Sequence, residues 1–452
     1  MPDFNRENDY KKIRIFTIHH GSENFPDLKN SVTSSILCGE PGRYGYRIAL
    51  KDGNGHARSR YFDPDLYSEF AAIFWLWDER WFCGDYNSDY IGFMHYRSFL
   101  NLGIDTEEPY QLSDLPLKNV GMTERKILAA MANWDILTSD PLTDFGNMTI
   151  REQFAACHPL ADEMLNISRD LLVSTGRIKK KDFDEYFDTR GMKPYFKCLT
   201  VFGNKEDCFN NYIGFVMYSL MEVEQRLQTK IMKLPNEKSR DYPTLKTRFR
   251  LLAFLGERLT AFFIYDAIKN GRFKVKTYPR AHYDKLSEML SAQYGSDKET
   301  LIPLYRFFCL ENRDHVMVTD LKEVDTMASK GYVCEGCVGY VKNASLKHDT
   351  GTDELIRLWS GQKNDHVALF QSFDLPEYKR RGYGEEGILG RAFLASGVGR
   401  IPLYSFQIRY KATGEVDKIS TTNLYELDEM RKDIRVEITQ QVGETCYICE
   451  RR

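Results

Sequence analysis

Apolar and polar positions alternate in two ways along residues 1–285, with short apolar runs between longer stretches of helical spacing. The run Lys12–His19 is apolar and rich in β-branched residues, which predicts a buried first strand. In Tyr67–Trp77 large apolar side chains recur at helical spacing, which predicts a helix with one buried face. The same patterns predict strands at Asp89–Tyr96 and Trp134–Thr138 and long helices at Cys208–Thr229 and Tyr242–Asn270. This alternation predicts an α/β domain with a mostly parallel sheet, whose chemistry gathers at the carboxyl ends of its strands.

After a polar stretch, residues 286–300, which we expect to be a linker, the chain becomes repetitive. Leu304-Tyr305-Arg306 returns 51 residues later as Leu355-Ile356-Arg357, and the same offset relates Asp314-His315 to Asp365-His366. A third, degraded copy begins near Pro402 and lacks the Asp-His pair. The repeats lie near residues 303–350, 354–400 and 402–452.

Strand-forming residues and turn glycines dominate these repeats, and a single unit of this length cannot bury its own apolar face. We therefore expect residues 301–452 to form an all-β, β-trefoil-like domain. A helix-containing repeat is the alternative, because Leu321–Lys330 and Leu375–Arg380 could each form a short helix. Residues 1–285 would then be one α/β domain and residues 301–452 a second.

Composition narrows the functional classes. The chain has 62 basic and 65 acidic residues, a balance that argues against a surface built to bind nucleic acid. Apolar runs are shorter than the roughly 20 residues that a membrane span needs, and the N-terminus carries charges where a signal peptide is apolar. These features predict a cytoplasmic protein. Its pairs Cys334/Cys337 and Cys446/Cys449 could together hold zinc, but buried free thiols are the preferred interpretation.

Three polar residues, His95-Tyr96-Arg97, end the apolar strand Asp89–Tyr96. At the carboxyl end of a strand, Arg97 can form a bidentate contact with a phosphate, and His95 can accept a proton or a metal ion. The alternative is an edge strand whose polar residues are only solvated. These residues are the first candidates for a functional site.

The motifs of the first domain resemble a bacterial glycosyltransferase domain that occurs in capsule and O-antigen gene clusters. The resemblance covers roughly residues 10–285 and rests on a Ser-Glu helix with aromatics followed by a strand ending in His-Tyr-Arg. The family usually has a second arginine after this motif, where this chain has Ser98. The matching motifs are Asp52-Gly53-Asn54, Ser68-Glu69, Phe74–Trp77, Gly92–Arg97, Thr149–His158 and Gly256-Glu257-Arg258-Leu259.

The resemblance implies a GT-A-like domain with a Rossmann-type sheet that binds a nucleotide-sugar, most often a UDP-sugar. Thr17 and His19, at the end of the first strand, would meet the base and ribose, although a structural role for His19 is equally open. Glu69 would bind the nucleoside or stabilise the N-terminus of its helix. The reaction would transfer a hexose, with galactofuranose as one candidate, to a surface polysaccharide.

Many GT-A enzymes hold a metal ion through an Asp-x-Asp motif, and the resemblance places His95-Tyr96-Arg97 at that position. Mg²⁺ and Mn²⁺ prefer oxygen ligands and would be poorly held without those two carboxylates. We therefore expect Arg97 to stabilise part of the leaving diphosphate's charge. The nearby Asp140 keeps a Mg²⁺ or Mn²⁺ site open.

An inverting transfer needs a base that deprotonates the acceptor hydroxyl, and its candidates are Glu257, His158 and Asp140. Glu257 and Arg258 interrupt an apolar helix, so they form either a buried ion pair or part of a site. His158 precedes Pro159 and is expected to cap a helix near the site. The catalytic candidates are Glu257, His95 and Asp140, and the substrate-binding candidates are Thr17, His19, Glu69, Tyr96, Arg97, His158 and Arg258.

The repeats resemble short lectin-like repeats appended to bacterial surface enzymes. Their Asp314-His315 and Asp365-His366 pairs, beside aromatic residues, would bind glycan or else stabilise a turn. The expected partners are a nucleotide-sugar donor and a glycan or lipid-linked glycan acceptor, with peripheral association to a membrane assembly complex. Two alternatives are a non-catalytic glycan-binding protein and a scaffold of such a complex.

Overall fold

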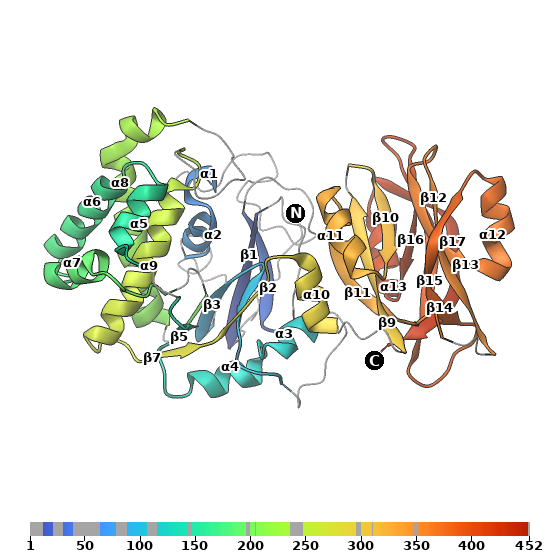
Figure 1. The fold of residues 1–452 in the computed structure, drawn as a ribbon, viewed down its shortest axis with the longest axis horizontal. Helices are drawn as coiled ribbons and strands as arrows, with labels where there is room; N and C mark the ends of the chain where they lie inside the picture. Colours follow the sequence, from blue (N-terminus) through green and yellow to red (C-terminus); the bar gives the residue numbers. More distant parts are fainter. Residues whose placement is uncertain are drawn as a thin grey trace. The chain divides into compact units, whose positions relative to one another are not determined.

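The computed structural model describes twelve segments of the chain, which form two compact units, the first made of most residues up to His282 and the second mainly of the residues from Tyr283 on. Figure 1 shows both units. None of the described helices is long and apolar enough to span a membrane. The described segments are residues 12–20, 30–38, 64–77, 88–105, 115–142, 146–195, 199–203, 205–235, 247–294, 300–309, 311–346 and 350–450.

The described part of the first unit contains an eight-stranded sheet in the order β2-β1-β3-β6-β5-β7, with β4 and β8 continuing from β3. The strands predicted at Lys12–His19, Asp89–Tyr96 and Trp134–Thr138 are confirmed as β1, β3 and β5. The strands are β1 (Ile13–His20), β2 (Thr33–Cys38), β3 (Tyr90–His95), β4 (Ser98–Leu100), β5 (Ile136–Ser139), β6 (Thr200–Phe202), β7 (Val275–Tyr278) and β8 (Arg280–His282).

Along the path β2-β1-β3-β6-β5-β7, five of the six strands run in one direction, so their carboxyl ends share one edge of the sheet. β1 pairs in parallel with β2 and β3, and β5 pairs in parallel with β7, whereas β6 lies antiparallel between β3 and β5. Phe93 of β3 and Thr138 of β5 both pair with Thr200. His95 and Asp140 are therefore level with each other, two strands or about 10 Å apart along the sheet.

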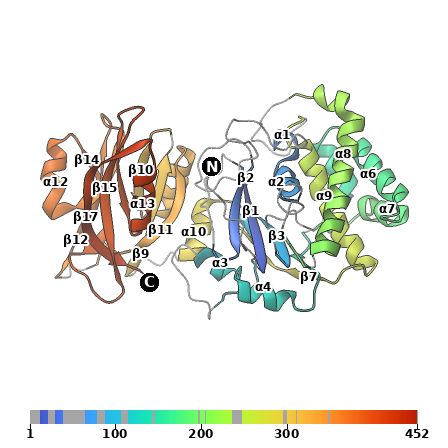
Figure 2. The same cartoon turned by 180° about the vertical axis from the view of Figure 1, so that it is seen from behind.

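Helices surround this sheet, and Figures 1 and 2 show α5 to α9 stacked beside it. The long helices predicted at Cys208–Thr229 and Tyr242–Asn270 are confirmed as α8 and α9, although α9 begins only at Leu251. The helices are α1 (Pro64–Tyr67), α2 (Glu69–Trp75), α3 (Leu115–Asn119), α4 (Glu124–Met131), α5 (Ile150–Cys157), α6 (Ala161–Ser174), α7 (Lys180–Asp188), α8 (Asn210–Met232) and α9 (Leu251–Lys269).

A glycine lets α9 approach α2 closely. A Cβ atom added at Gly256 would lie 2.7 Å from the ring of Phe70, which is itself fully buried in the core. Any larger residue would therefore push α9 away from α2, which begins at Glu69. This contact sets the distance between the two helices that carry the candidate site.

The second unit is built from three copies of one strand–strand–helix–strand unit, in a nine-stranded antiparallel arrangement. Its elements are β9 (Leu301–Cys309), β10 (Asp314–Val318), α11 (Leu321–Ser329), β11 (Val333–Lys342), β12 (Thr352–Ser360), β13 (Asp365–Phe370), α12 (Gln371–Arg380), β14 (Gly384–Phe393), β15 (Arg400–Tyr410), β16 (Val416–Thr421), α13 (Leu424–Lys432) and β17 (Val436–Cys449). The last strands of the copies, β11, β14 and β17, all pair with one another and close the ring.

Two expectations for this region need correction. Each copy contains a helix, so the helix-containing repeat describes the unit and a β-trefoil is not shown. The stretch expected as a linker contains α10 (Leu286–Tyr294), whose buried side chains Leu286, Met289 and Leu290 recur at helical spacing. Ser287 of this helix also donates its hydroxyl to Asp325 of α11, at 2.6 Å.

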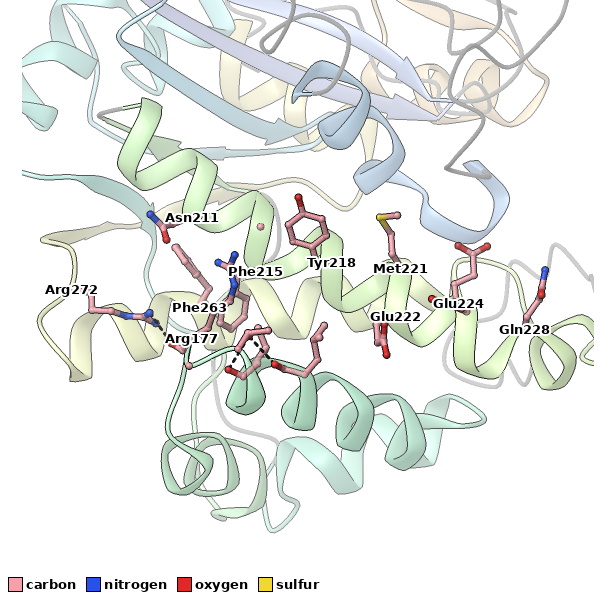
Figure 3. Close-up of a pocket in the computed structure, with 16 residues that line it drawn as sticks. Arg177, Asn211, Phe215, Tyr218, Met221, Glu222, Glu224, Gln228, Phe263 and Arg272 are labelled. Atoms are coloured by element: carbon pink, nitrogen blue, oxygen red, sulfur yellow. Dashed lines mark hydrogen bonds between the residues drawn. The ribbon is translucent and has the colours of Figure 1, made fainter.

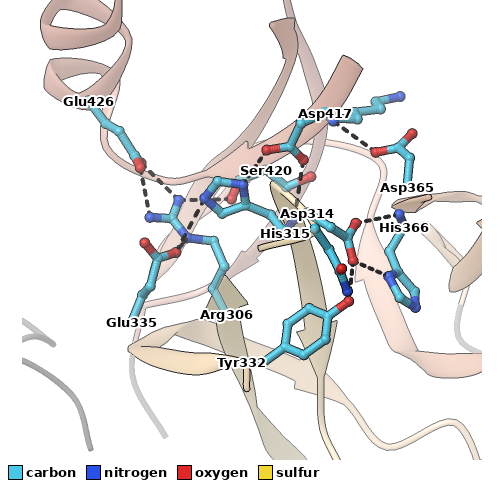
Figure 4. A network of polar contacts seen from close by, with 12 residues as sticks. Arg306, Asp314, His315, Tyr332, Glu335, Asp365, His366, Asp417, Ser420 and Glu426 are labelled. Atoms are coloured by element: carbon cyan, nitrogen blue, oxygen red, sulfur yellow. Dashed lines mark hydrogen bonds and ion pairs between the residues drawn. The ribbon is translucent and has the colours of Figure 1, made fainter. Parts of the chain in front are cut away.

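The Asp-His pairs bond one another across the repeats (Figure 4). His366 of the second copy donates from its backbone N–H and from Nδ1 to Asp314 of the first, at 2.7 and 2.5 Å. His315 of the first copy donates in the same way to Asp417 of the third, at 3.2 and 2.6 Å. Asp314 and Asp417 are fully buried. The pairs therefore stabilise the closed ring, which supports the structural alternative to glycan binding.

The third copy keeps the aspartate of this motif but not the histidine. Asp417 is the counterpart of Asp314, and Lys418 takes the place of the imidazole. Only the backbone N–H of Lys418 reaches Asp365, at 3.2 Å, while its ammonium binds the hydroxyl of Tyr378. Asp365 thus accepts no hydrogen bond from an imidazole. Burial together with the neighbouring carboxylates raises its pKa to about 7.

Burial would lower the pKa of both imidazoles, but neighbouring carboxylates outweigh it. Asp417 and Glu335 beside His315 raise its pKa to about 9, and Asp314 and Glu386 raise that of His366 to about 9. Both imidazoles are therefore positively charged at neutral pH and compensate buried carboxylates. They form ion pairs inside the protein.

The four CxxC cysteines lie on two strands of this unit. Cys334, Cys337 and Cys446 are buried free thiols, and Cys449 is half-buried. Among the described residues, the only potential metal ligands that gather in threes are Asp314, Asp365 and Asp417, which already accept the hydrogen bonds above. The arrangement supports buried thiols over a four-cysteine zinc site.

We predict that Gly256→Ala destabilises the first unit. The added methyl group clashes with Phe70, which costs about 1–3 kcal/mol, and better helix propensity offsets about 1 kcal/mol of this at most. Urea denaturation of the full chain measures the change. Gly387→Ala is the control, because its Cβ meets open space and should change stability by less than about 0.5 kcal/mol. Equal effects of the two variants would contradict the packing argument.

We predict that His366→Ala destabilises the repeat unit by about 3–5 kcal/mol, because it leaves the buried carboxylate of Asp314 without its cation. Lys418→Ala, at the matched position of the third copy, keeps the backbone N–H on Asp365 and should cost only about 1 kcal/mol. Thermal unfolding of the full chain compares the two variants. A similar loss for both would contradict the cyclic ion pairing.

The same pairs predict a pH dependence. Since the folded-state pKa of both imidazoles is raised, their stabilisation is complete below about pH 6.5 and is lost as the pH rises through about 9. The free energy of unfolding of the repeat unit should therefore fall over this window. Urea denaturation across the window tests this, and His315→Gln/His366→Gln should flatten the fall. A wild-type stability that rises with pH would overturn the assignment.

Candidate functional site

A buried carboxylate, that of Glu69, lies at the centre of the candidate site. Glu69 is the first residue of α2 and is only 2% exposed. Its Oε1 lies 3.8 Å from Nε2 of His95, the last residue of β3, and 3.5 Å from Nη2 of Arg250, the residue before α9. Three elements distant in sequence therefore meet at one carboxylate.

Arg250 also fixes the residue before Glu69. Its Nε donates to Oγ of Ser68 at 2.8 Å, so one guanidinium holds both residues of the Ser-Glu motif. Ser68 and Arg250 both have left-handed backbones, with φ of 50° and 58°. Non-glycine residues in this region cost about 1–3 kcal/mol each and are concentrated at functional sites. The local geometry is thus held by tertiary contacts against its own backbone preference.

The turn after β3 carries Tyr96 and Arg97, both half-buried. The ring of Tyr96 lies 4.1 Å from that of His95 and 5.9 Å from that of His19 on β1, centroid to centroid. The backbone N–H of Arg97 donates to Nδ1 of His95 at 3.4 Å. Nδ1 thus accepts a hydrogen bond, which leaves the Nε2 proton to face Glu69.

Several buried polar atoms along this edge of the sheet have no hydrogen-bond partner among the described residues. They are Oγ1 of Thr17, Nε of Arg97, Oγ of Ser139 and Oγ1 of Thr200. Buried polar groups normally have partners, so these atoms indicate positions where a polar ligand could bind. Two of them, Thr17 and Arg97, were predicted from the sequence as substrate-binding residues.

The first turns of α9 carry a second group. The ring of Phe254 stacks on that of His158, the residue that caps the C-terminus of α5, at 4.2 Å between centroids. Arg258 donates from Nη2 to the side chain of Gln153 at 2.6 Å and lies over a ring of α5. Glu257 is half-buried and shares the helix face of Phe254 and Arg258, because the three have i, i+3, i+4 spacing. α9 therefore connects the Glu69 group to the end of α5.

His158 is confirmed as the residue that caps α5. Burial and the charge of Arg258 lower the pKa of its imidazole to about 3. A neutral imidazole of such low basicity can exchange hydrogen bonds but is a weak base at neutral pH. His158 is therefore the weakest of the three candidates for the general base, and it stays a substrate-binding candidate.

Asp140 follows β5 at the same sheet edge as His95 and is exposed. In the described part of the chain, Asp140 does not belong to any group of three potential metal ligands. A single carboxylate is too few ligands for Mg²⁺ or Mn²⁺, which coordinate six oxygens, unless substrate phosphates supply the others. Asp140 and the described side chains around it therefore do not form a metal site by themselves.

The structure thus brings most predicted residues of the first unit into two groups. Glu69, His95, Tyr96 and His19 lie together, and His158 and Arg258 form the second group. Asp314, His315, Asp365 and His366 belong to the other unit and bond one another. The motif Asp52-Gly53-Asn54 lies outside the described residues.

Sequence reasoning missed Arg250, Thr200 and the bonding role of Ser68. The position of Arg250, four residues before Phe254 and eight before Arg258, was visible as a helical spacing of basic and aromatic residues. Thr200 lies on a three-residue strand that is too short to give a pattern. Asp417 was missed because its offset from Asp365 is 52 residues, where the other copies have 51.

Comparisons with known proteins agree with a division into two parts. A family model described as a domain of unknown function, DUF4422, matches residues 14–269, and a second such model, DUF5648, matches residues 274–393 and 303–435. None of the curated proteins matches the chain.

One solved structure, described as the apo structure of the WbbM bifunctional glycosyltransferase, matches with a TM-score of 0.43 and 19% identity. The match covers 61% of this chain and 46% of that one, so the chain spans less than half of that protein's length. The DUF4422 model, in contrast, extends from β1 to the last residue of α9 and includes both groups of site residues. The chain belongs to the DUF4422 family.

Proposed function

We propose that the first unit is a glycosyltransferase that moves a hexose from a nucleotide-sugar to a surface-polysaccharide acceptor. The observation that carries this proposal is the buried Nε of Arg97, two residues after His95 at the sheet edge, which has no hydrogen-bond partner in the described part of the chain. Such an arginine matches the charge of a diphosphate. The resemblance of the Ser-Glu and His-Tyr-Arg motifs to capsule and O-antigen glycosyltransferases supplies the class of reaction.

The donor is a UDP-sugar in this proposal, with galactofuranose as one candidate sugar. Thr17 and His19 on β1 would contact the base and ribose, since both are buried at the edge that carries Arg97. Tyr96 lies between His19 and Arg97 and would give the nucleotide an aromatic face. Glu69 is buried, and its role in this proposal is to orient His95 for contact with the donor.

In the reaction, the bond between the anomeric carbon and the diphosphate oxygen breaks while the acceptor hydroxyl oxygen bonds to that carbon. Arg97 stabilises the negative charge that develops on the leaving diphosphate. The acceptor proton passes to Glu257, the half-buried carboxylate on the α9 face that also carries Arg258. Asp140 is the alternative base. This assignment favours inversion at the anomeric carbon.

The repeats would hold the acceptor or a partner enzyme through surfaces other than the Asp-His pairs. Because these pairs bond each other inside the ring, a scaffold within a membrane assembly complex is favoured over a lectin. The protein would act at the cytoplasmic face of the membrane. Removing residues 301–452 would then abolish complex formation while sparing transfer to a free acceptor.

Nucleotide release from a panel of UDP-, GDP-, CMP- and dTDP-sugars, with and without EDTA, tests the proposal. We expect slow hydrolysis of one donor, a UDP-sugar, and the EDTA arm decides whether a divalent cation takes part. If no donor is hydrolysed and none binds by calorimetry, the transferase proposal fails. A protein that binds oligosaccharide but no donor would be the non-catalytic glycan-binding alternative.

We predict that Arg97→Gln lowers kcat for the hydrolysed donor by about 10²–10³, because it removes a charge that acts on the leaving group. Glu257→Gln should lower transfer to an acceptor by about 10²-fold or more and affect donor binding little. Arg431→Gln, an exposed residue paired with Asp428, is the control for the loss of one positive charge. An Arg97→Gln enzyme as active as Arg431→Gln would contradict the role of Arg97.

A further inference from the structure

An open groove lies between α6 and α8 of the first unit, separate from the strand-end site (Figure 3). It has a volume of about 1110 Å³ and contains none of the residues predicted from the sequence as catalytic or substrate-binding. Its α8 wall extends from Asn211 to Gln228, which corresponds to about 25 Å of helix. A groove of this length can hold an extended chain rather than a single small molecule.

Arg177 lies in this groove with its guanidinium against the backbone of α8. A Cβ atom at Gly214 would lie 3.0 Å from Nη2 and 3.3 Å from Nη1 of Arg177. Glycine within a helix costs about 1 kcal/mol relative to alanine, so its presence calls for a structural reason. Here the glycine makes room for the guanidinium beside the backbone of α8.

The guanidinium of Arg177 makes no ion pair with any residue in the described part of the chain. Its neighbour Arg272 is paired with Asp266 and donates to the backbone oxygen of Arg177 at 2.9 Å. Burial and the positive charge of Arg177 lower the pKa of Arg272. Two guanidinium groups with one carboxylate leave one positive charge uncompensated at this end of the groove.

The acids of the groove do not supply the missing charge. Glu222 is paired with Arg226 at 2.5 Å, and Glu224 accepts a hydrogen bond from the hydroxyl of Tyr67 at 2.5 Å. Glu224 keeps its charge but lies ten residues, or about 15 Å of helix, beyond Gly214, which the guanidinium of Arg177 contacts. The uncompensated guanidinium of Arg177 is therefore the group in this groove that would bind an anionic ligand.

The middle of the groove has the features of a carbohydrate site. The side chain of Tyr218 is 49% exposed and lines the groove, where it can stack on the apolar face of a sugar ring. Polar side chains that can bind hydroxyl groups line the same wall. They are Asn211, Gln225 and Gln228.

The far end of the groove leads toward the strand-end site. Glu224 is bonded to Tyr67, the last residue of α1, and Tyr67 directly precedes the Ser68-Glu69 motif. A chain lying along α8 would thus end beside the helix that carries Glu69. This continuity is what a transferase needs to hold an acceptor.

We propose that this groove binds an anionic carbohydrate, the acceptor glycan, with a carboxylate or phosphate on Arg177 and a sugar ring on Tyr218. The acceptor role rests on the proposed transferase function. The binding itself rests on the uncompensated charge of Arg177, the space made by Gly214 and the exposed ring of Tyr218.

Calorimetry of the full chain tests the proposal with a hyaluronan hexasaccharide, which carries carboxylates, with maltohexaose as the neutral oligosaccharide of equal length, and with inorganic phosphate. We expect the hyaluronan hexasaccharide to bind about tenfold more tightly than maltohexaose. Arg177→Gln should remove this preference, and Gly214→Ala should weaken it because the methyl group displaces the guanidinium. Tyr218→Ala should weaken binding of both oligosaccharides.

Arg190→Gln is the matched control, because Arg190 is 60% exposed and lies outside the groove. If the Arg177→Gln and Arg190→Gln variants bind the hyaluronan hexasaccharide with the same affinity, the proposal is overturned. It is also overturned if the wild-type protein binds neither oligosaccharide. Inorganic phosphate that binds as tightly as the hexasaccharide would also overturn it, since the site would then recognise an anion alone.

Donor hydrolysis by the wild-type protein separates this proposal from the transferase proposal. If hyaluronan binds through Arg177 and no donor is hydrolysed, the groove is a glycan site and its acceptor role falls with the transferase. If a donor is hydrolysed but neither oligosaccharide binds, the transferase stands and the groove proposal is wrong.

Discussion

The buried carboxylate of Glu69 is the constraint on which the organisation of the first unit depends. A charge in the protein interior is strongly destabilising unless cationic partners and hydrogen bonds compensate it. Here the compensation comes from His95 at the end of a central strand and from Arg250 at the start of α9. Because these groups come from three elements, the sheet, α2 and α9 must reach their final positions together. The close contact of Gly256 with Phe70 permits this approach.

The same physical requirement organises the repeat unit, with a different outcome. Two imidazolium–aspartate pairs join copies of the repeat, and at the third interface Asp365 accepts only the backbone N–H of Lys418 from the neighbouring copy. In the first unit the compensated charge lies near buried polar atoms that have no hydrogen-bond partner among the described residues, whereas in the ring the carboxylates of Asp314, Asp365 and Asp417 all accept hydrogen bonds from the same unit. That difference separates a candidate binding site from a structural ion-pair network, although both contain buried histidine and acid pairs.

The sequence predicted the elements whose patterns are long and the motifs whose residues are adjacent. The strands β1, β3 and β5 and the helices α8 and α9 have clear periodicity, and the His95-Tyr96-Arg97 turn follows directly from a strand end. The partner of Glu69 could not be predicted, because Arg250 lies 181 residues away and its left-handed backbone depends on tertiary contacts. The role of the repeat histidines was equally hidden, since each pairs with an aspartate from another copy, and sequence spacing carries no information on such pairing.

A titration of the chain with UDP, observed through its labelled histidine side chains by NMR, tests the central claim most directly. The chain has nine histidines, of which His95 and His19 belong to the proposed nucleotide site and His315 and His366 to the ring of repeats. We expect UDP to shift the imidazole resonances of His95 and His19, while those of His315 and His366 stay unchanged. Unchanged signals of His95 and His19 at saturating UDP, or shifts confined to His315 and His366, would contradict a nucleotide site at the Glu69–His95 pair.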